Sequence, residues 1–156
     1  MAYQQEPDTI LWMVRSDGVL LGMTYARSQK VIGWHRHVIG GTNAKVESVA
    51  VIPNPEGTAD DLWAVIQRTV NGVSVRYIEF LTQGLPEGGT TTQDATFLDS
   101  MLTYTGGEVS SVFGLSHLEG QTVSVLADGA AHPDRTVSSG SISLNDVYST
   151  VHVGFP

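Results

Sequence analysis

Two Asx-Gly dipeptides constrain the fold of this chain more than any other feature. Asp17-Gly18 and Asn71-Gly72 each stand between two runs of apolar, β-prone residues. Both residues of such a pair tolerate a positive φ angle, which the tight turn of a β-hairpin requires. Residues 9–27 and 61–81 are therefore predicted to form two antiparallel hairpins.

The composition supports an all-β chain. Of the 156 residues, 17 are glycine, and 41% are hydrophobic whereas only 15% are charged. Valine, threonine and serine are abundant, while long stretches rich in leucine, glutamate, lysine and alanine, which are typical of helices, are missing. We therefore predict the all-β class, with antiparallel strands.

Strand and turn signals divide the chain into two predicted domains joined by a linker. Residues 1–83 hold six predicted strands in an antiparallel meander. Residues 84–96 are rich in glycine and threonine and are predicted to form the linker. Residues 97–156 hold five or six shorter strands with closely spaced turns, which is typical of a small barrel or sandwich.

In one predicted strand of the first domain, residues 44–53, successive side chains are expected to point to opposite faces, as in a half-buried strand. Strict alternation predicts one face made of Val46, Ser48, Ala50 and Ile52. It predicts an opposite face made of Glu47, Val49 and Val51.

The net charge of −8 is unevenly placed along the chain. Residues 1–83 carry seven basic and eight acidic residues, a net charge of −1. Residues 84–156 carry only Arg135 against eight acidic residues, a net charge of −7. An acidic domain repels phosphate backbones, so we do not expect specific binding of nucleic acid.

Several classes of protein are excluded by what the sequence lacks. It contains no cysteine, which excludes disulfides and thiolate chemistry. No apolar run approaches the roughly 18 residues of a membrane span, and the polar residues 1–10 do not resemble a signal peptide. Phosphate-binding, dinucleotide-binding and nucleophile-elbow motifs are also missing. We therefore expect no enzymatic activity, no cofactor and no membrane partner.

The segment VIGWHRHVIGG, residues 31–41, contains the first candidate site. Residues two apart in a strand point to the same face, so His35 and His37 should stand side by side. Such a pair could begin a metal site or serve as a catalytic base with a helper. A metal site needs a third ligand, and no other histidine lies at a spacing that supplies one.

We interpret the same segment as an interface. Trp34 is expected to pack within the fold, whereas His35, Arg36 and His37 are expected at polar positions on the two faces of the strand. The predicted interface residues, at a contact with a neighbouring chain, are Trp34, His35, Arg36 and His37.

A second candidate site lies in ADGAAHPDR, residues 127–135. Asp128, His132 and Asp134 could bind a cation or act as acid and base. The same residues are ordinary turn formers, and the calcium-loop pattern is absent, so we predict turns here. Exposed aromatic residues could stack on sugars, although at alternating strand positions they more often pack in the core. These residues are Tyr25, Trp34, Trp63 and Tyr77.

The order of the motifs resembles a known family of viral proteins. Residues 12–37, 46–53 and 61–81 resemble a recurrent block in large tail proteins of short-tailed bacteriophages and related prophages. Residues 97–106, 114–144 and 149–156 resemble the module that follows this block. The similarity covers nearly the whole chain in the same order.

This resemblance implies a structural protein of the virion tail, in the tube, hub or nozzle, assembled in the bacterial cytoplasm. The first domain would be a propeller-like block. The second would be a small six-stranded β-barrel, similar to the first-catalytic-cysteine half-domain of ubiquitin-activating enzymes but without their chemistry. The implied partners are further copies of the chain and adjacent tail proteins, while DNA passes through the assembly. No catalytic residue is implied.

The chain is much shorter than members of this family, and six strands cannot close a propeller. We therefore expect either a piece of a longer protein or a sheet that pairs with other copies through its edges. The chain also stops directly after a predicted strand, which favours the first expectation. The alternative function is a carbohydrate- or receptor-binding tail module that uses aromatic, Asp and Asn side chains in the turns of the second domain.

Overall fold

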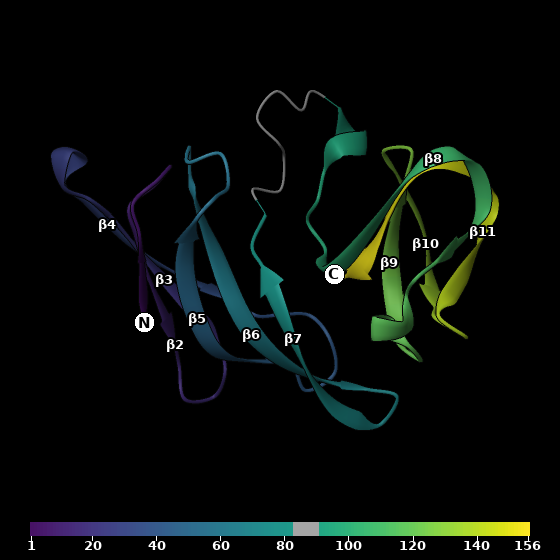
Figure 1. Ribbon diagram of the computed structural model, residues 1–156, viewed down its shortest axis with the longest axis horizontal. Helices are drawn as coiled ribbons and strands as arrows, with labels where there is room; N and C mark the ends of the chain where they lie inside the picture. The colour runs from purple at the N-terminus through teal and green to yellow at the C-terminus, as the bar shows by residue number, and fades with distance from the viewer. Residues whose placement is uncertain (83–90) are drawn as a thin grey trace. The chain divides into compact units, whose positions relative to one another are not determined.

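The computed structural model describes residues 1–82 and 91–156 (Figure 1). The fold is all-β and antiparallel, as predicted from the hairpin turns and the composition. It divides into two compact units. The first consists of residues 1–69 and 74–82, and the second of residues 70–73 and the described part of 83–156. No helix in these residues has the length and apolarity of a membrane span.

The first unit contains two antiparallel sheets, with strand orders β1-β2-β3-β4 and β5-β6-β7. Both predicted hairpins are present. Gly18 turns β2 into β3 with a φ of 90°, and Asn71 and Gly72 turn β6 into β7 with φ angles of 49° and 76°. The strands are β1 (Ala2–Gln4), β2 (Ile10–Val14), β3 (Leu20–Ala26), β4 (Val31–His37), β5 (Lys45–Pro53), β6 (Asp60–Val70) and β7 (Val73–Phe80).

The prediction of one six-stranded meander is wrong in two respects. The short strand β1 was not predicted, and it pairs antiparallel with β2. The chain also changes sheets between β4 and β5, where Gly41 and Asn43 have positive φ angles of 109° and 52°. The change of sheet allows apolar faces of both sheets to be buried together. The shared buried cluster consists of Trp12 and Leu20 from the first sheet and Val46, Leu62 and Ile66 from the second.

The prediction that side chains alternate strictly along β5 is also wrong, because the strand contains a β-bulge. The β5–β6 register shifts between Val46 and Ser48, so Glu47 is an additional residue in β5. A bulge of this kind reverses the alternation of side chains beyond it. Val46 is therefore buried together with Val49 and Val51, which pack against the same cluster.

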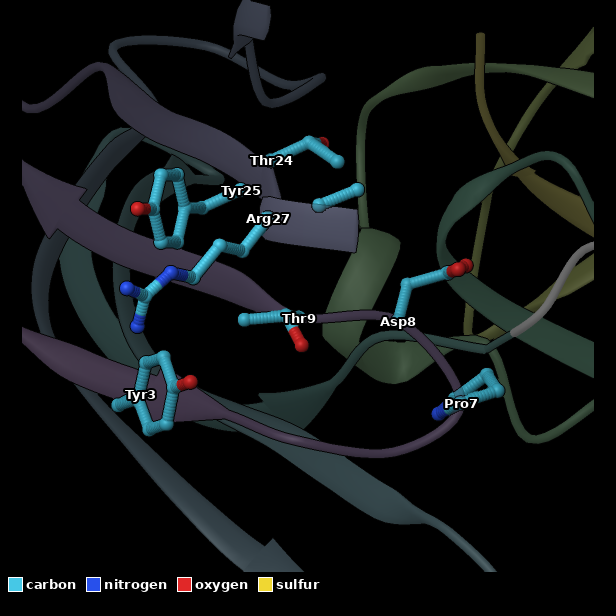
Figure 2. A pocket seen from close by; sticks show the side chains of 8 residues that line it. Tyr3, Pro7, Asp8, Thr9, Thr24, Tyr25 and Arg27 are labelled. Atoms are coloured by element: carbon cyan, nitrogen blue, oxygen red, sulfur yellow. The ribbon is translucent and has the colours of Figure 1, made fainter. Parts of the chain in front are cut away.

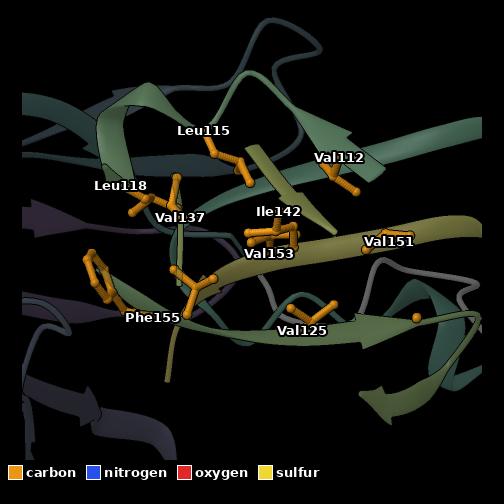
Figure 3. Close-up of a cluster of buried hydrophobic side chains, with 11 residues drawn as sticks. Val112, Leu115, Leu118, Val125, Val137, Ile142, Val151, Val153 and Phe155 are labelled. Atoms are coloured by element: carbon orange, nitrogen blue, oxygen red, sulfur yellow. The ribbon is translucent and has the colours of Figure 1, made fainter. Parts of the chain in front are cut away.

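The second unit contains one antiparallel sheet with strand order β10-β9-β11-β8. Its strands are β8 (Asp99–Phe113), β9 (Thr122–Ala127), β10 (Ala130–Thr136) and β11 (Ser141–Phe155). Figure 3 shows its buried core, to which every strand or the turn beside it contributes. The core consists of Val112, Leu115, Leu118, Val123, Val125, Ala127, Val137, Ile142, Val151, Val153 and Phe155.

Four strands replace the six of the predicted barrel. Gly106 and Gly107 lie within the 15-residue β8. β11 is equally long, and its pairing with β8 shifts register between Ser143 and Tyr148. The two strands curve together in Figure 1. Each long strand takes the place of two predicted short ones because bulges let pairing continue through the bend. The described residues of this sheet pair in the order β10-β9-β11-β8.

Only part of the predicted linker, residues 84–96, belongs to the described residues. Residues 84–90 lie outside the described part of the chain. Thr92–Asp94 form a 3-10 helix, η2. The Gln93 carbonyl oxygen lies 2.8 Å from Nε2 of the buried His152, which donates to it. Residues 91–96 are therefore packed into the second unit rather than extended between units.

Candidate functional site

His35 and His37 stand side by side on β4, as the sequence predicts. His35 Nδ1 and His37 Nε2 are 2.9 Å apart, and the ring planes meet at 84°. Both rings contact the buried indole of Trp12, with centroid distances of 5.5 and 5.4 Å. The pair therefore packs on the inner face of the first sheet, against the core of this unit.

Gly22 provides the space that this packing needs. It pairs with Trp12 on β2 and with His35 on β4, so the three residues form one row across the sheet. A Cβ atom at Gly22 would lie 2.1 Å from His35 Cε1. Gln4 Oε1 extends the row, since it accepts a 2.8 Å hydrogen bond from Trp12 Nε1. The histidine pair is thus held in a row to which every strand of this sheet contributes a residue.

The metal interpretation of this pair requires a third ligand. Within residues 1–82 and 91–156, no three His, Asp or Glu side chains are grouped as metal ligands would be. The nitrogens of His35 and His37 that face each other are within hydrogen-bonding distance. The contacts of the pair are those of a packed aromatic cluster.

Trp34 does not pack within the fold, and that part of the prediction is wrong. Strand alternation places Trp34 and Arg36 on the outer face of the first sheet, opposite the histidines. The Trp34 side chain is 63% exposed, and Ile32 on the same face is 62% exposed. The predicted interface residues therefore separate into an inner pair that stabilises the unit and an outer pair that is accessible to a partner.

β4 and β7 share two properties, and they carry more exposed apolar side chains than the other edge strands, β1 and β5, where Tyr3 and Ile52 are exposed. Each ends its sheet in the described part of the chain, so one side of each strand has no neighbouring strand. Each also carries exposed large apolar side chains, which are Val31, Ile32 and Trp34 on β4 and Val73, Ile78 and Phe80 on β7. Exposed apolar edge strands are sites of β-sheet association.

A hollow of about 550 Å³ opens beside β1 and β3 (Figure 2). Tyr3 and Tyr25 contribute their rings, and the guanidinium end of Arg27 lies between them in this view. Both tyrosines are accessible, with exposed fractions of 53% and 42%. The complete lining is Tyr3, Pro7, Asp8, Thr9, Thr24, Tyr25, Ala26 and Arg27.

Two charged groups of the hollow are unsatisfied by the protein. Throughout the described residues, the side chains of Asp8 and Arg27 make no hydrogen bond or ion pair. Among these residues, Tyr25 was a candidate from the sequence, whereas Tyr3, Asp8 and Arg27 were not. No local pattern connects these residues, because strand pairing and the loop before β2 bring them together.

The second candidate site is mainly a structural turn. Asp128 and Gly129 have φ angles of 46° and 78°, which confirms the predicted turn at this position. The Asp128 carboxylate accepts hydrogen bonds from the backbone amides of Ser149 and Thr150, at 3.1 and 2.8 Å. Asp128 therefore connects this turn to β11.

His132 and Asp134 do not join Asp128 in a common site. They lie within β10, beside a register shift, so the turn predicted for these two residues is wrong. His132 Nε2 accepts from the Asn145 amide at 3.1 Å, and Asp134 accepts from the Ser124 hydroxyl at 3.0 Å. These side chains bind separate partners, as structural residues do.

One buried ion pair was not predicted. The Arg68 side chain on β6 is 1% exposed and pairs with Glu79 on β7. Arg68 Nε also donates to the Gly40 carbonyl oxygen at 2.8 Å. This contact connects the second sheet to the segment that follows β4.

The chain was also compared with known proteins. No protein-family model matches it, and no curated protein matches it.

Proposed function

We propose that this chain is a non-enzymatic structural component of a bacteriophage or prophage tail, in the tube, hub or nozzle. It would associate with further copies of itself and with neighbouring tail proteins of the virion. The order of sequence motifs over nearly the whole chain supports the tail assignment. The observation that carries the structural role is the pair of apolar, exposed edge strands, β4 and β7.

Edge pairing is the mechanism of association that we propose. An edge strand offers backbone donors and acceptors along its open side, and a second strand satisfies them by extending the sheet. Trp34 and Ile32 would be buried beside such a junction on the outer face. Tryptophan and arginine are the residues on which interface affinity most often depends, so Trp34 and Arg36 are the proposed anchors.

The acidic second half suits a position beside passing DNA. Residues 84–156 carry one basic and eight acidic residues. A surface of this charge repels the phosphate backbone and limits adhesion of the DNA. A basic surface on the lumen side of the assembled tail would contradict this part of the proposal.

Light scattering coupled to size-exclusion chromatography tests the association directly. We expect the purified chain to form assemblies of several copies, and the Trp34→Lys variant to shift toward the monomer mass. Phe97→Lys is the matched control, because Phe97 is 71% exposed but lies outside every strand. A monomeric wild-type chain at all concentrations, or equal dissociation by both variants, would contradict association through β4.

A further inference from the structure

We infer that the hollow beside β1 and β3 is a subsite for neutral pyranose sugars. It lies in the first unit, and not in the turns of the second domain that the sequence suggested. The inference goes beyond the proposed tail function and stands on different residues. Its basis is the combination of accessible aromatic rings, unsatisfied polar groups and a loop that is held in place.

The aromatic part of the hollow is provided by Tyr3 and Tyr25. Their rings lie on β1 and β3, line the same hollow and remain about half exposed. The C–H face of a pyranose is apolar and packs on such a ring, while the phenol hydroxyl stays available for hydrogen bonds. Two rings that line one hollow match a ligand with an apolar face and a polar rim.

The polar part is provided by Asp8 and Arg27, which have opposite charges and no protein partner among the described residues. A carboxylate only accepts hydrogen bonds, and a guanidinium only donates them. Sugar hydroxyls do both, so a polyhydroxylated ligand in the hollow can satisfy either group. A purely apolar ligand would leave both charges desolvated, and a phosphate or carboxylate could bind Arg27 but has no donor for Asp8. The pair therefore selects a neutral polyhydroxylated ligand.

The loop that carries Asp8 is fixed at both ends before any ligand binds. Asp60 Oδ2 accepts hydrogen bonds from the Gln5 and Glu6 amides at 2.8 and 3.2 Å. At the other end, the Tyr25 amide donates to the Thr9 carbonyl oxygen at 3.0 Å. A site held in its binding geometry loses less entropy when the ligand binds.

The experiment uses the full chain on an array of neutral and acidic glycans, followed by saturation-transfer NMR with the strongest hit. We expect binding to neutral hexose-containing glycans and at least a tenfold loss of affinity in Tyr3→Ala/Tyr25→Ala. Tyr25→Phe should keep most of the affinity, because the ring face remains. Asp8→Asn and Arg27→Gln should each weaken binding.

Phe113→Ala is the matched control for nonspecific stacking, because Phe113 is 71% exposed on β8 of the second unit. It should bind as the wild type does, and circular dichroism melting should show that every variant is folded. The inference is overturned by an array without any bound glycan, by unchanged binding in the double variant, or by binding confined to acidic glycans. Such a result would leave association through β4 unaffected, because light scattering tests residues outside the hollow.

Discussion

At the scale of single residues, the missing side chain of Gly22 organises the inner face of the first sheet. The His35 ring occupies the position that a Cβ of Gly22 would take, and this places it against both His37 and Trp12. The histidines, which suggested a metal site in the sequence, are therefore part of the packing. Only the cross-strand register brings these four residues together.

Gly22→Ala tests this arrangement. The new Cβ would lie 2.1 Å from His35 Cε1, so the ring has to leave its contacts with His37 and Trp12. We expect a loss of about 1–3 kcal/mol in the free energy of unfolding, measured by urea denaturation. Gly33→Ala is the control, because nothing lies within 4 Å of its added Cβ. Equal effects of the two substitutions would contradict the role of Gly22.

Asp17, in the first hairpin turn, makes the stability of the folded chain depend on pH in a defined direction. The hydrogen bond from Arg15 lowers the pKa of the Asp17 carboxyl from 3.8 to about 2. The depressed pKa stabilises the folded chain above about pH 4, and this contribution is lost as the pH falls toward 2. The pair is exposed to solvent, so the effect on stability is small.

A carbon-detected NMR titration of the Asp17 carboxyl should give a midpoint near 2. Arg15→Gln should raise the midpoint toward 3.8, the ordinary value of the group. The same midpoint in both proteins would show that Arg15 does not hold the carboxylate in solution.

At the scale of elements, the ion pair of Arg68 and Glu79 joins β6 to β7. The Arg68 guanidinium is almost completely buried, whereas Glu79 is 21% exposed. Removing the carboxylate leaves a buried cation with fewer partners. The resulting loss in the free energy of unfolding is larger than the net stabilisation that the ion pair provides. The periodicity of the sequence did not predict this contact, because Arg68 occupies an inward position of β6 that an apolar residue usually takes.

Glu79→Ala should therefore lower the free energy of unfolding by about 3 kcal/mol, measured by urea denaturation. Glu47→Ala is the matched control, since Glu47 pairs with Arg76 on the solvent side of the same sheet. Its effect should be much smaller, because exposed ion pairs contribute little. If Glu47→Ala is as destabilising as Glu79→Ala, burial of the ion pair does not explain its contribution to stability.

The bulges are the second feature at this scale, and they explain most of the differences from the predicted elements. One additional residue, Glu47, moves Val49 and Val51 to the buried face of β5. Register shifts in β11 allow one long strand where two short ones were predicted. A period-two pattern assumes a regular strand, so it fails at the residue where the register changes.

At the scale of the whole molecule, the chain has two separate cores. Trp12, Leu20, Val46, Leu62 and Ile66 form one, and the fully buried residues of the other lie between positions 112 and 155. All three tryptophans, Trp12, Trp34 and Trp63, lie in the first unit. Tryptophan fluorescence therefore reports the unfolding of the first unit alone.

Leu118→Ala should destabilise the second unit selectively. Leu118 is completely buried, and truncation of a buried leucine costs about 2–5 kcal/mol. In urea, we expect the far-UV circular dichroism to show an early transition while the tryptophan transition stays in place. Leu62→Ala should move the tryptophan transition instead. If Leu118→Ala shifts the tryptophan signal equally, the two units unfold as one.

Three features could be predicted from the sequence: the all-β class, the antiparallel hairpins at Asp17-Gly18 and Asn71-Gly72, and the side-by-side placement of His35 and His37. These features depend on φ preferences and on the two-residue repeat of a strand, which are local. The division of the first seven strands into two sheets became known only from the three-dimensional structure. The same is true of the exposure of Trp34 and of the hollow lined by Tyr3, Asp8, Tyr25 and Arg27. These outcomes depend on register, bulges and the pairing of strands distant in sequence, which no local pattern encodes.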